Sequence, residues 1–215
     1  MKNKIALIFN GVWSQYTFAK SPKYKEMFEL IYVYDVNEEI LENFVALVIP
    51  FQSNQKELMV NKEMYHKFLN AGKKIFIEGD AAEGLFGARW EDRPVNNYWW
   101  VISPDEPPIA ETDYDHPVYN GLKPRHACWH THGVYTKIPE FAKVIQSNKA
   151  GDIITWQQQF GDGLLLATTL DPIVEHGIQQ ITHLDNYVDK LVFWLCGEKP
   201  EGQFVFVKED FGISL

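Results

Sequence analysis

The stretch Lys73–Gly84, KKIFIEGDAAEG, decides the fold of this chain. It begins with a short apolar strand, Ile75–Ile77, and continues into an acidic turn, Glu78–Gly84. Open α/β sheets hold nucleophiles and ligand loops where a strand stops at a glycine and the chain enters a helix. This turn contains neither cysteine nor serine. The segment therefore predicts the geometry of a catalytic elbow without its usual nucleophile.

Three further apolar runs precede this segment: Ile5–Phe9, Leu30–Tyr34 and Phe44–Pro50. Continuous apolar runs are typical of strands that are covered on both faces. Lys56–Ala71 has apolar residues at helical spacing, and the glycine that follows predicts a helix C-terminus. Strands that alternate with helices in this way predict right-handed βαβ units and a parallel sheet, which is an α/β fold.

The second half of the chain is richer in β-type patterns. Prolines between Arg89 and Pro124 disfavour helix there, and we treat residues 88–124 as an excursion from one domain that spans residues 1–215. The expected β segments are Trp99–Ser103, His126–Val134, Ala142–Gln146, Ile153–Gln159, Leu164–Thr169 and an edge strand at Phe204–Val207. A closing helix is expected over Thr182–Leu195, ended by Gly197.

The composition excludes several classes of function. The net charge is −9 and no run of Lys or Arg is present, so binding to a nucleic-acid backbone is not expected. No apolar run approaches the ~20 residues of a membrane span, and the N-terminus lacks the apolar core of a signal peptide. The two cysteines, Cys128 and Cys196, form no CxxC motif or disulfide framework. We expect a soluble cytoplasmic protein, and the sequence predicts no cofactor.

Acidic residues follow two of the expected strands. Glu78, Asp80 and Glu83 come after the Ile75–Ile77 strand, whereas Asp171, Glu175 and His176 come after Leu164–Thr169. If both turns lie at the same end of the sheet, these groups could bind a divalent metal, hydrogen-bond sugar hydroxyls or act as acid and base. The alternative is that they cap helix N-termini, where the helix dipole favours acidic side chains.

His126, Cys128, His130 and His132 alternate along the sequence, and on a strand all four would share one face. Same-face neighbours on a strand lie ~6.6 Å apart, so His130 and His132 would need a carboxylate from elsewhere to hold zinc or iron. A metal-dependent hydrolase that uses His130 and His132 is therefore one alternative. A half-buried strand whose histidines make polar contacts is the simpler interpretation, and we predict no bound metal.

Two other clusters could contact a ligand. Trp90, Tyr98, Trp99 and Trp100 lie in the excursion, and exposed aromatic faces bind sugar rings or nucleobases. Such residues equally form a small core of their own or the interface of a homo-oligomer. Gln52–Asn54 follows the third strand, where backbone N–H groups could hold an anion or oxyanion, or where Ser53 or Asn54 could cap the next helix.

Three segments carry a resemblance to a known family: DHPVYNGLKPRHACWHTHGVYTKIP (Asp115–Pro139), GDGLLLATTLDPIVEHG (Gly161–Gly177) and YVDKLVFWLCG (Tyr187–Gly197). They resemble the trehalose-utilisation (ThuA-like) branch of the class I glutamine amidotransferase-like superfamily. The first resembles the family's His-Pro-apolar-x-x-Gly-Leu stretch and the second its Gly-x-Gly strand. The third resembles its closing helix with a tryptophan and a final glycine. The family's Gly-His after Thr-Thr-Leu is replaced here by Asp171-Pro172.

The resemblance implies a flavodoxin-like, mostly parallel sheet with helices on both faces and a site at the carboxyl ends of the strands. It also places a triad-like histidine near His176. Because residues 80–82 offer no thiol or hydroxyl, an acyl-enzyme cannot form there, and glutamine hydrolysis is disfavoured. In an enzymatic form His176 would be the general acid or base, oriented by Glu175 or Asp171, and Asp80 would contact the substrate.

We therefore expect an amidotransferase-like domain that lacks the catalytic cysteine and binds, and in an enzymatic form processes, a small polar ligand. A carbohydrate-related ligand is the first candidate, contacted by Glu78, Ser53, Trp99, Trp100 and His132. The alternatives are the metal-dependent hydrolase and a non-catalytic scaffold or interaction subunit.

Overall fold

The computed structural model describes residues 3–93, 97–179 and 181–205. Within them, one ten-stranded sheet has the main order β2-β1-β3-β4-β10-β9-β7-β5, with β8 also paired to β9 and β6 to β8. Its first five strands, as far as β10, are parallel, and the remaining pairings are antiparallel. The sheet of this α/β fold is therefore mixed.

The parallel part is built from strand–helix units. Its elements are β1 (Ile5–Phe9), α1 (Trp13–Lys20), β2 (Phe28–Tyr32), α2 (Glu38–Glu42), β3 (Ala46–Ile49), α3 (Gln55–Val60), α4 (Lys62–Asn70), β4 (Lys74–Glu78) and α5 (Ala81–Phe86). The four apolar runs predicted as parallel strands in one sheet are confirmed, with boundaries shifted by up to two residues.

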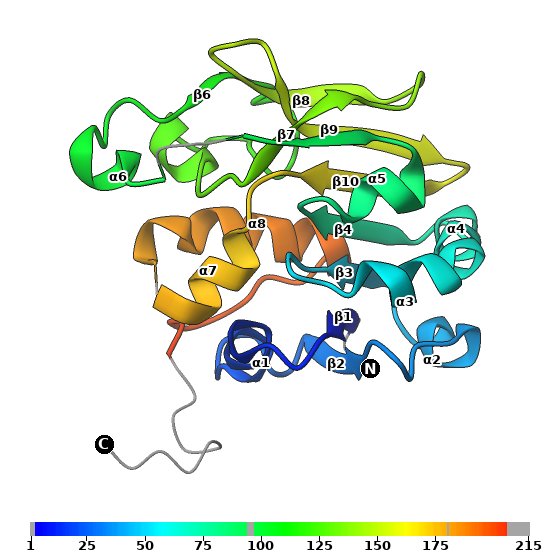
Figure 1. Cartoon of the computed structure of the whole chain (residues 1–215). Helices are drawn as coiled ribbons and strands as arrows, with labels where there is room; N and C mark the ends of the chain where they lie inside the picture. Colours follow the sequence, from blue (N-terminus) through cyan, green and yellow to red (C-terminus); the bar gives the residue numbers. More distant parts are fainter. Residues whose placement is uncertain (1–2, 94–96, 180, 206–215) are drawn as a thin grey trace.

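The antiparallel part and the closing helices follow. They comprise β5 (Arg89–Asp92), α6 (Trp99–Ile102), β6 (Ile109–Thr112), the 3₁₀ helix η1 (Pro124–Ala127), β7 (Gly133–Lys137), β8 (Lys143–Asn148), β9 (Ile153–Phe160), β10 (Gly163–Thr168), α7 (Pro172–Gln179), the 3₁₀ helix η2 (Thr182–Leu184) and α8 (Asp185–Cys196). Figure 1 shows α1, α7 and α8 on one side of the parallel strands and α2 to α5 on the other.

Each face of the sheet has its own apolar core. Along β1, Ile5 and Leu7 belong to one buried cluster, whereas Ala6 and Ile8 belong to the other. This alternation is what a strand covered on both faces requires, because successive side chains point to opposite faces. The unbroken apolar character of β1 therefore follows from its place between two helical layers.

Three predicted elements differ in the structure, and a fourth is described in the next paragraph. Trp99–Ser103, expected as a strand, contains the helix α6, in which the Trp99 side chain is buried in the core. Packing thus outweighs the β-propensity of the Trp-Trp-Val-Ile sequence. The expected single helix Lys56–Ala71 is two helices that meet at Asn61. Of the expected strand Phe204–Val207, Phe204 and Val205 lie in no strand, and the other two residues fall outside the described part.

The expected strand His126–Val134 is also wrong over most of its length. Pro124 opens the 3₁₀ helix η1, which includes His126, because its fixed φ suits the first turn of a helix. Regular strand begins only at Gly133. The alternation of His126, Cys128, His130 and His132 therefore does not place four side chains on one face.

No helix in the described residues is long and apolar enough to cross a membrane.

Candidate functional site

The candidate site lies where β4 and β10 end side by side. Glu78, the last residue of β4, pairs in register with Thr168, the last residue of β10. The Glu78 carboxylate is completely buried and accepts two backbone hydrogen bonds, from the N–H of Ile173 at 2.7 Å and from the N–H of Phe51 at 3.2 Å. Glu78 thus joins the loop after β3 to the first turn of α7.

Burial dominates the electrostatics of Glu78. Loss of solvent raises the pKa of its carboxyl well above the usual range, and the charges of Asp171 and Glu175 raise it further. The two hydrogen bonds from backbone N–H groups act in the opposite direction. A carboxyl group held here beside two other acids is the kind of perturbed group that gathers at functional sites.

Asp171 and His132 form a direct pair beside Glu78. The Oδ2 atom of Asp171 lies 3.0 Å from Nε2 of His132. Asp171 is only 1% exposed, and its other oxygen, Oδ1, has no hydrogen-bond partner among the described residues. Burial raises the pKa of Asp171, and the hydrogen bond to Asp171 raises the pKa of His132. Both shifts favour the protonated form of the group concerned.

The His132 side chain is 39% exposed and is fixed from a second direction. Its ring stacks on Phe51, with ring centroids 4.5 Å apart and an interplanar angle of 11°. Phe51 itself lies over Gly79, where an added Cβ would meet a Phe51 ring carbon at 2.4 Å. Gly79 also has φ of 79°, which favours glycine. The glycine in the elbow therefore makes room for the ring that supports His132.

A second acid–histidine pair lies one helical turn along α7. Nδ1 of His130 is 3.7 Å from Oε2 of Glu175, and both side chains are largely buried. The His130 ring stacks on Trp129, with centroids 4.5 Å apart. The charges of His130, His132 and Glu175 all act on Asp171, so the two pairs belong to one electrostatic cluster.

His176 lies outside this cluster, and its predicted orientation by Glu175 or Asp171 is wrong. Its ring is fully buried, 4.4 Å from the ring of Phe204, and its Nε2 lies 3.1 Å from Asp185. Successive residues of a helix point in different directions. Glu175 therefore faces His130, whereas His176 faces α1 and the C-terminal segment. A ring enclosed in this way has no path to a ligand.

Asp80 is also separate from the α7 acids. Its carboxylate accepts a hydrogen bond from Gln55 Nε2 at 2.9 Å, and among the described residues it makes no hydrogen bond or ion pair with Asp171, Glu175 or His176. Burial raises its pKa, as do the charges of Asp92 and Glu83. Asp80 and His176, which the sequence places after strands that end at the same edge of the sheet, thus have different partners, Gln55 and Asp185. Asp80 stands at the start of α5 and faces α3 instead.

The remaining predicted ligand contacts have structural roles. Ser53 is 8% exposed and donates to the Pro50 carbonyl, while Asn54 caps α3 by accepting from Glu57 N–H. Trp99 is 4% exposed, and Trp100 packs against Trp129. A buried indole cannot stack on a ligand. Trp99 therefore belongs to a core, which was the alternative considered for it, and the partly buried Trp100 packs against that core.

Sequence reasoning missed Phe51 and Tyr135 as parts of the site. The Tyr135 hydroxyl donates to the carbonyl of Gly79 and so ties β7 to the elbow. The available signal for Phe51 was its position directly after Pro50 at a strand end. Nothing in the spacing of Tyr135 indicates its contact, because the residue comes from the antiparallel part of the sheet.

The described residues contain no group of three or more His, Cys, Asp and Glu side chains arranged to hold a metal ion. His130 and His132 each face a different carboxylate, Glu175 and Asp171 respectively. The two histidines therefore do not converge on one point.

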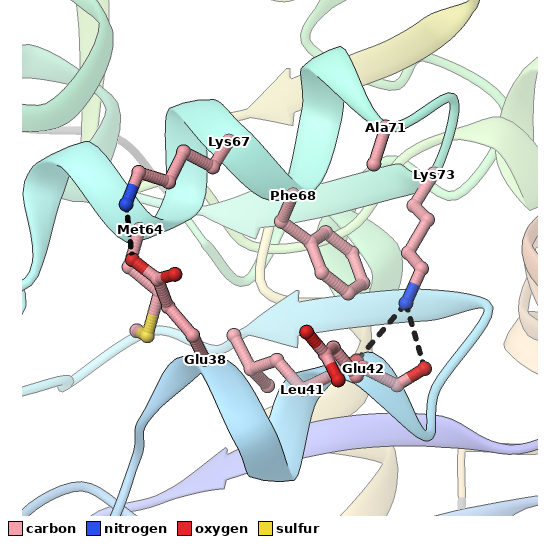
Figure 2. A pocket seen from close by; sticks show the side chains of 8 residues that line it. All are labelled: Glu38, Leu41, Glu42, Met64, Lys67, Phe68, Ala71 and Lys73. Carbon is pink, nitrogen blue, oxygen red and sulfur yellow. Dashed lines mark hydrogen bonds and ion pairs between the residues drawn. The ribbon is translucent and has the colours of Figure 1, made fainter.

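A cavity of about 140 Å³ lies elsewhere, between α2 and α4 (Figure 2). Its lysines are already paired: Lys67 with Glu38, and Lys73 with the carbonyls of Leu41 and Glu42. Lys73 precedes β4, so this cavity is at the opposite end of the strand from Glu78. Ligands of open α/β sheets bind at the carboxyl ends of the strands, which favours the Glu78 end.

Comparison with known proteins gives a fold and no family. No family model matches the chain, and no curated protein matches it. Among solved structures, the cytoplasmic proteins STM3548 and STM1381 of Salmonella typhimurium are 12% and 11% identical, with TM-scores of 0.58 and 0.59. The matches cover 92% and 91% of this chain and all of each Salmonella protein.

A provisionally assigned GMP synthase subunit from Thermoplasma acidophilum is 14% identical, with a TM-score of 0.58 over 90% of this chain and 96% of its own. Such low identities establish the fold alone. The chain shares the α/β fold of these proteins.

Proposed function

We propose that this chain is an amidotransferase-like domain without a cysteine nucleophile that binds a small polar, carbohydrate-related ligand at the carboxyl ends of β4 and β10. The observation that carries the proposal is the Asp171–His132 pair. A buried carboxylate with one unpartnered oxygen holds a partly exposed imidazole at Nε2. One face of the imidazole ring stacks on Phe51. Buried polar atoms without partners are uncommon in proteins, and acids with perturbed pKa values gather at functional sites.

The pair can move a proton between the protein and a ligand. Asp171 occupies Nε2 of His132, and no group in the described part of the chain hydrogen-bonds Nδ1. Protonated His132 can donate from Nδ1 to a ligand oxygen, and the neutral ring can accept a hydroxyl proton there. The buried carboxylate stabilises the imidazolium form, as an acid that orients a catalytic histidine does.

A ligand rich in hydroxyl groups fits this chemistry. Hydroxyls both donate and accept, so they can satisfy an imidazole and a carboxyl group together. A strongly charged anion fits less well, because three acids, Glu78, Asp171 and Glu175, lie together at this site. The resemblance to the ThuA-like branch points in the same direction. Hydrolase-like processing of such a ligand is the enzymatic form of the proposal, with His132 rather than His176 as the acid or base.

The test measures binding of neutral sugars by NMR in wild type, His132→Ala and Asp171→Asn. We expect saturable shifts in wild type and a loss of affinity of about tenfold or more in both variants, as for hydrogen bonds to charged groups. His126→Ala, a partly buried histidine on η1, is the control and should bind as wild type does. Wild-type affinity in both site variants would refute the proposal.

A non-catalytic scaffold is the competing function, favoured by the absence of a thiol or hydroxyl at residues 80–82. It predicts that no small molecule shifts the resonances of His132. The metal-dependent hydrolase predicts near-stoichiometric zinc, iron or manganese in protein purified without an affinity tag. Loss of that metal in a His130→Ala/His132→Ala variant would establish it, whereas we expect no metal above trace level.

A further inference from the structure

Two exposed tyrosines stand at the carboxyl end of β2, at the same end of the sheet as His132. Tyr32 is 44% exposed and Tyr34 is 58% exposed. Their ring centroids lie 5.3 Å apart, and the Tyr32 ring also contacts Phe9, at 6.4 Å. The hydroxyl of Tyr34 accepts a hydrogen bond from Asn54 Nδ2 at 3.1 Å. The Tyr34 ring is therefore held in place although most of it faces solvent.

The loop that holds Tyr34 is the loop that supports His132. Phe51, at one end, stacks on the imidazole, and Asn54, at the other end, binds the tyrosine. Two side chains fix this loop. Asn10, directly after β1, accepts at Oδ1 from Asn54 N–H at 2.8 Å, and Gln15, in α1, donates from Nε2 to the Phe51 carbonyl at 3.3 Å. The loop is thus a hydrogen-bonded bridge between the two places.

The loop also sets how far apart the two places are. Phe51 and Asn54 are three residues apart, so their Cα atoms are separated by at most about 11 Å. Between them Gln52 is exposed and has φ of 65°, a conformation that non-glycine residues adopt only where the surroundings hold it. To contact His132 and the tyrosines together, a ligand has to extend along this loop, so it carries more than one ring.

We infer that Tyr32 and Tyr34 form a ring-stacking subsite of the proposed ligand site, so that the ligand carries a second ring with apolar faces and a polar edge. This inference rests on the proposed function. A tyrosine face offers apolar area and its hydroxyl offers a polar edge, which matches a pyranose ring or a nucleobase. Gln52 is exposed in the loop between Phe51 and Asn54, and its side-chain amide can hydrogen-bond the linkage.

Isothermal titration tests the subsite with three kinds of probe: the monosaccharides glucose, galactose and mannose; the trisaccharides maltotriose, cellotriose and mannotriose; and adenosine. In wild type we expect at least one trisaccharide, or adenosine, to bind more tightly than every monosaccharide. Tyr34→Ala should weaken that probe about fivefold, the value of one lost aromatic contact, and leave monosaccharide binding unchanged. Tyr34→Phe keeps the ring and should lose less.

Phe141→Ala is the matched control, because Phe141 is 84% exposed in the loop between β7 and β8. It should bind every probe as wild type does. Tighter binding of a trisaccharide would identify the second ring as a pyranose, whereas tighter binding of adenosine would identify it as a nucleobase. The inference fails if no probe binds wild type, if longer probes bind no better than monosaccharides, or if Tyr34→Ala and Phe141→Ala behave alike. His132→Ala separates this inference from the proposed function: if it leaves all binding intact while Tyr34→Ala weakens it, the ligand binds at the tyrosines alone.

Discussion

Asp171 holds His132 through a 3.0 Å contact between Oδ2 and Nε2 that joins the start of α7 to the segment before β7. Asp171 follows β10, which is parallel to β4, whereas His132 precedes β7, which belongs to the antiparallel part of the sheet. An isolated antiparallel bridge between Thr131 and Leu170, the residues directly before His132 and Asp171, brings these two segments together. The candidate site therefore forms at the border between the two halves of the sheet.

This pair predicts an elevated pKa for His132. The hydrogen bond to Asp171 stabilises the imidazolium, so the ring should titrate above the ordinary 6.5. Because the folded pKa is raised, the pair contributes stability that is fully present below pH 6.5 and is lost as pH rises through the folded pKa. Imidazole resonances followed by NMR measure the pKa directly. In Asp171→Asn it should fall toward or below 6.5, and an unchanged value would contradict the pairing.

Glu78→Gln should destabilise the fold and loosen the site. A glutamine keeps one acceptor oxygen, so it cannot accept from both Phe51 and Ile173. One backbone N–H is left buried without a partner, which costs about 1–3 kcal/mol. Urea denaturation measures the loss, and Glu26→Gln, at an exposed position on the surface, is the control. If both variants unfold at the same urea concentration, Glu78 does not join these two segments.

Gly79→Ala and Gly87→Ala form a matched pair. Both glycines have positive φ, 79° and 76°, so both substitutions strain the backbone, by about 1 kcal/mol. Only at Gly79 would the new Cβ collide with Phe51, whereas nothing lies within 4 Å at Gly87. Gly79→Ala should therefore be the less stable variant, and it alone should shift the His132 resonances. Equal effects on His132 would show that the Phe51 ring does not connect the elbow to the histidine.

The parallel strands were predictable because their signal is local. Ile5–Phe9 and Ile75–Ile77 are apolar on both faces, and only a strand between two helical layers has that pattern. The acidic turns were likewise assigned to the same end of the sheet from the direction of the strands alone. Glu78 and Asp171 do lie together there, because Glu78 accepts a hydrogen bond from the N–H of Ile173, two residues after Asp171, and the charge of Asp171 acts on Glu78.

The partners within the site were not predictable, because they depend on rotation about helices and on non-local contacts. Glu175 and His176 are neighbours in sequence, yet one faces His130 and the other faces Asp185. No spacing rule decides which of two adjacent helix positions faces a cleft without knowing the helix's orientation. His130 and His132 were misplaced for a different reason, since Pro124 starts a 3₁₀ helix where alternation suggested a strand.

Glutamine hydrolysis should be absent. Residues 80–82 hold no thiol or hydroxyl, and both cysteines are remote from the elbow turn in sequence and buried. Burial raises the pKa of the Cys128 and Cys196 thiols, which disfavours the reactive thiolate. Ammonia release from glutamine should equal that of the buffer blank. Activity that iodoacetamide abolishes would show that one of the two cysteines acts as a nucleophile after all.

His183 should make the fold sensitive to mild acid. Burial, and after it the positive charge of Arg125, lower its pKa to about 4. The folded state therefore keeps a neutral ring where the unfolded chain becomes protonated near pH 6.5. Stability should then fall as pH decreases from about 6.5 to about 4, because the unfolded state binds more protons in that range.

Urea denaturation across this range measures how the free energy of unfolding changes with pH. The slope is compared for wild type, for His183→Gln, which removes the titrating group, and for His126→Gln as a neighbouring control. The His183→Gln slope should be smaller than the other two. If all three slopes coincide, His183 does not remain neutral in the fold, and the packing of Trp129 against its ring does not exclude the charged form.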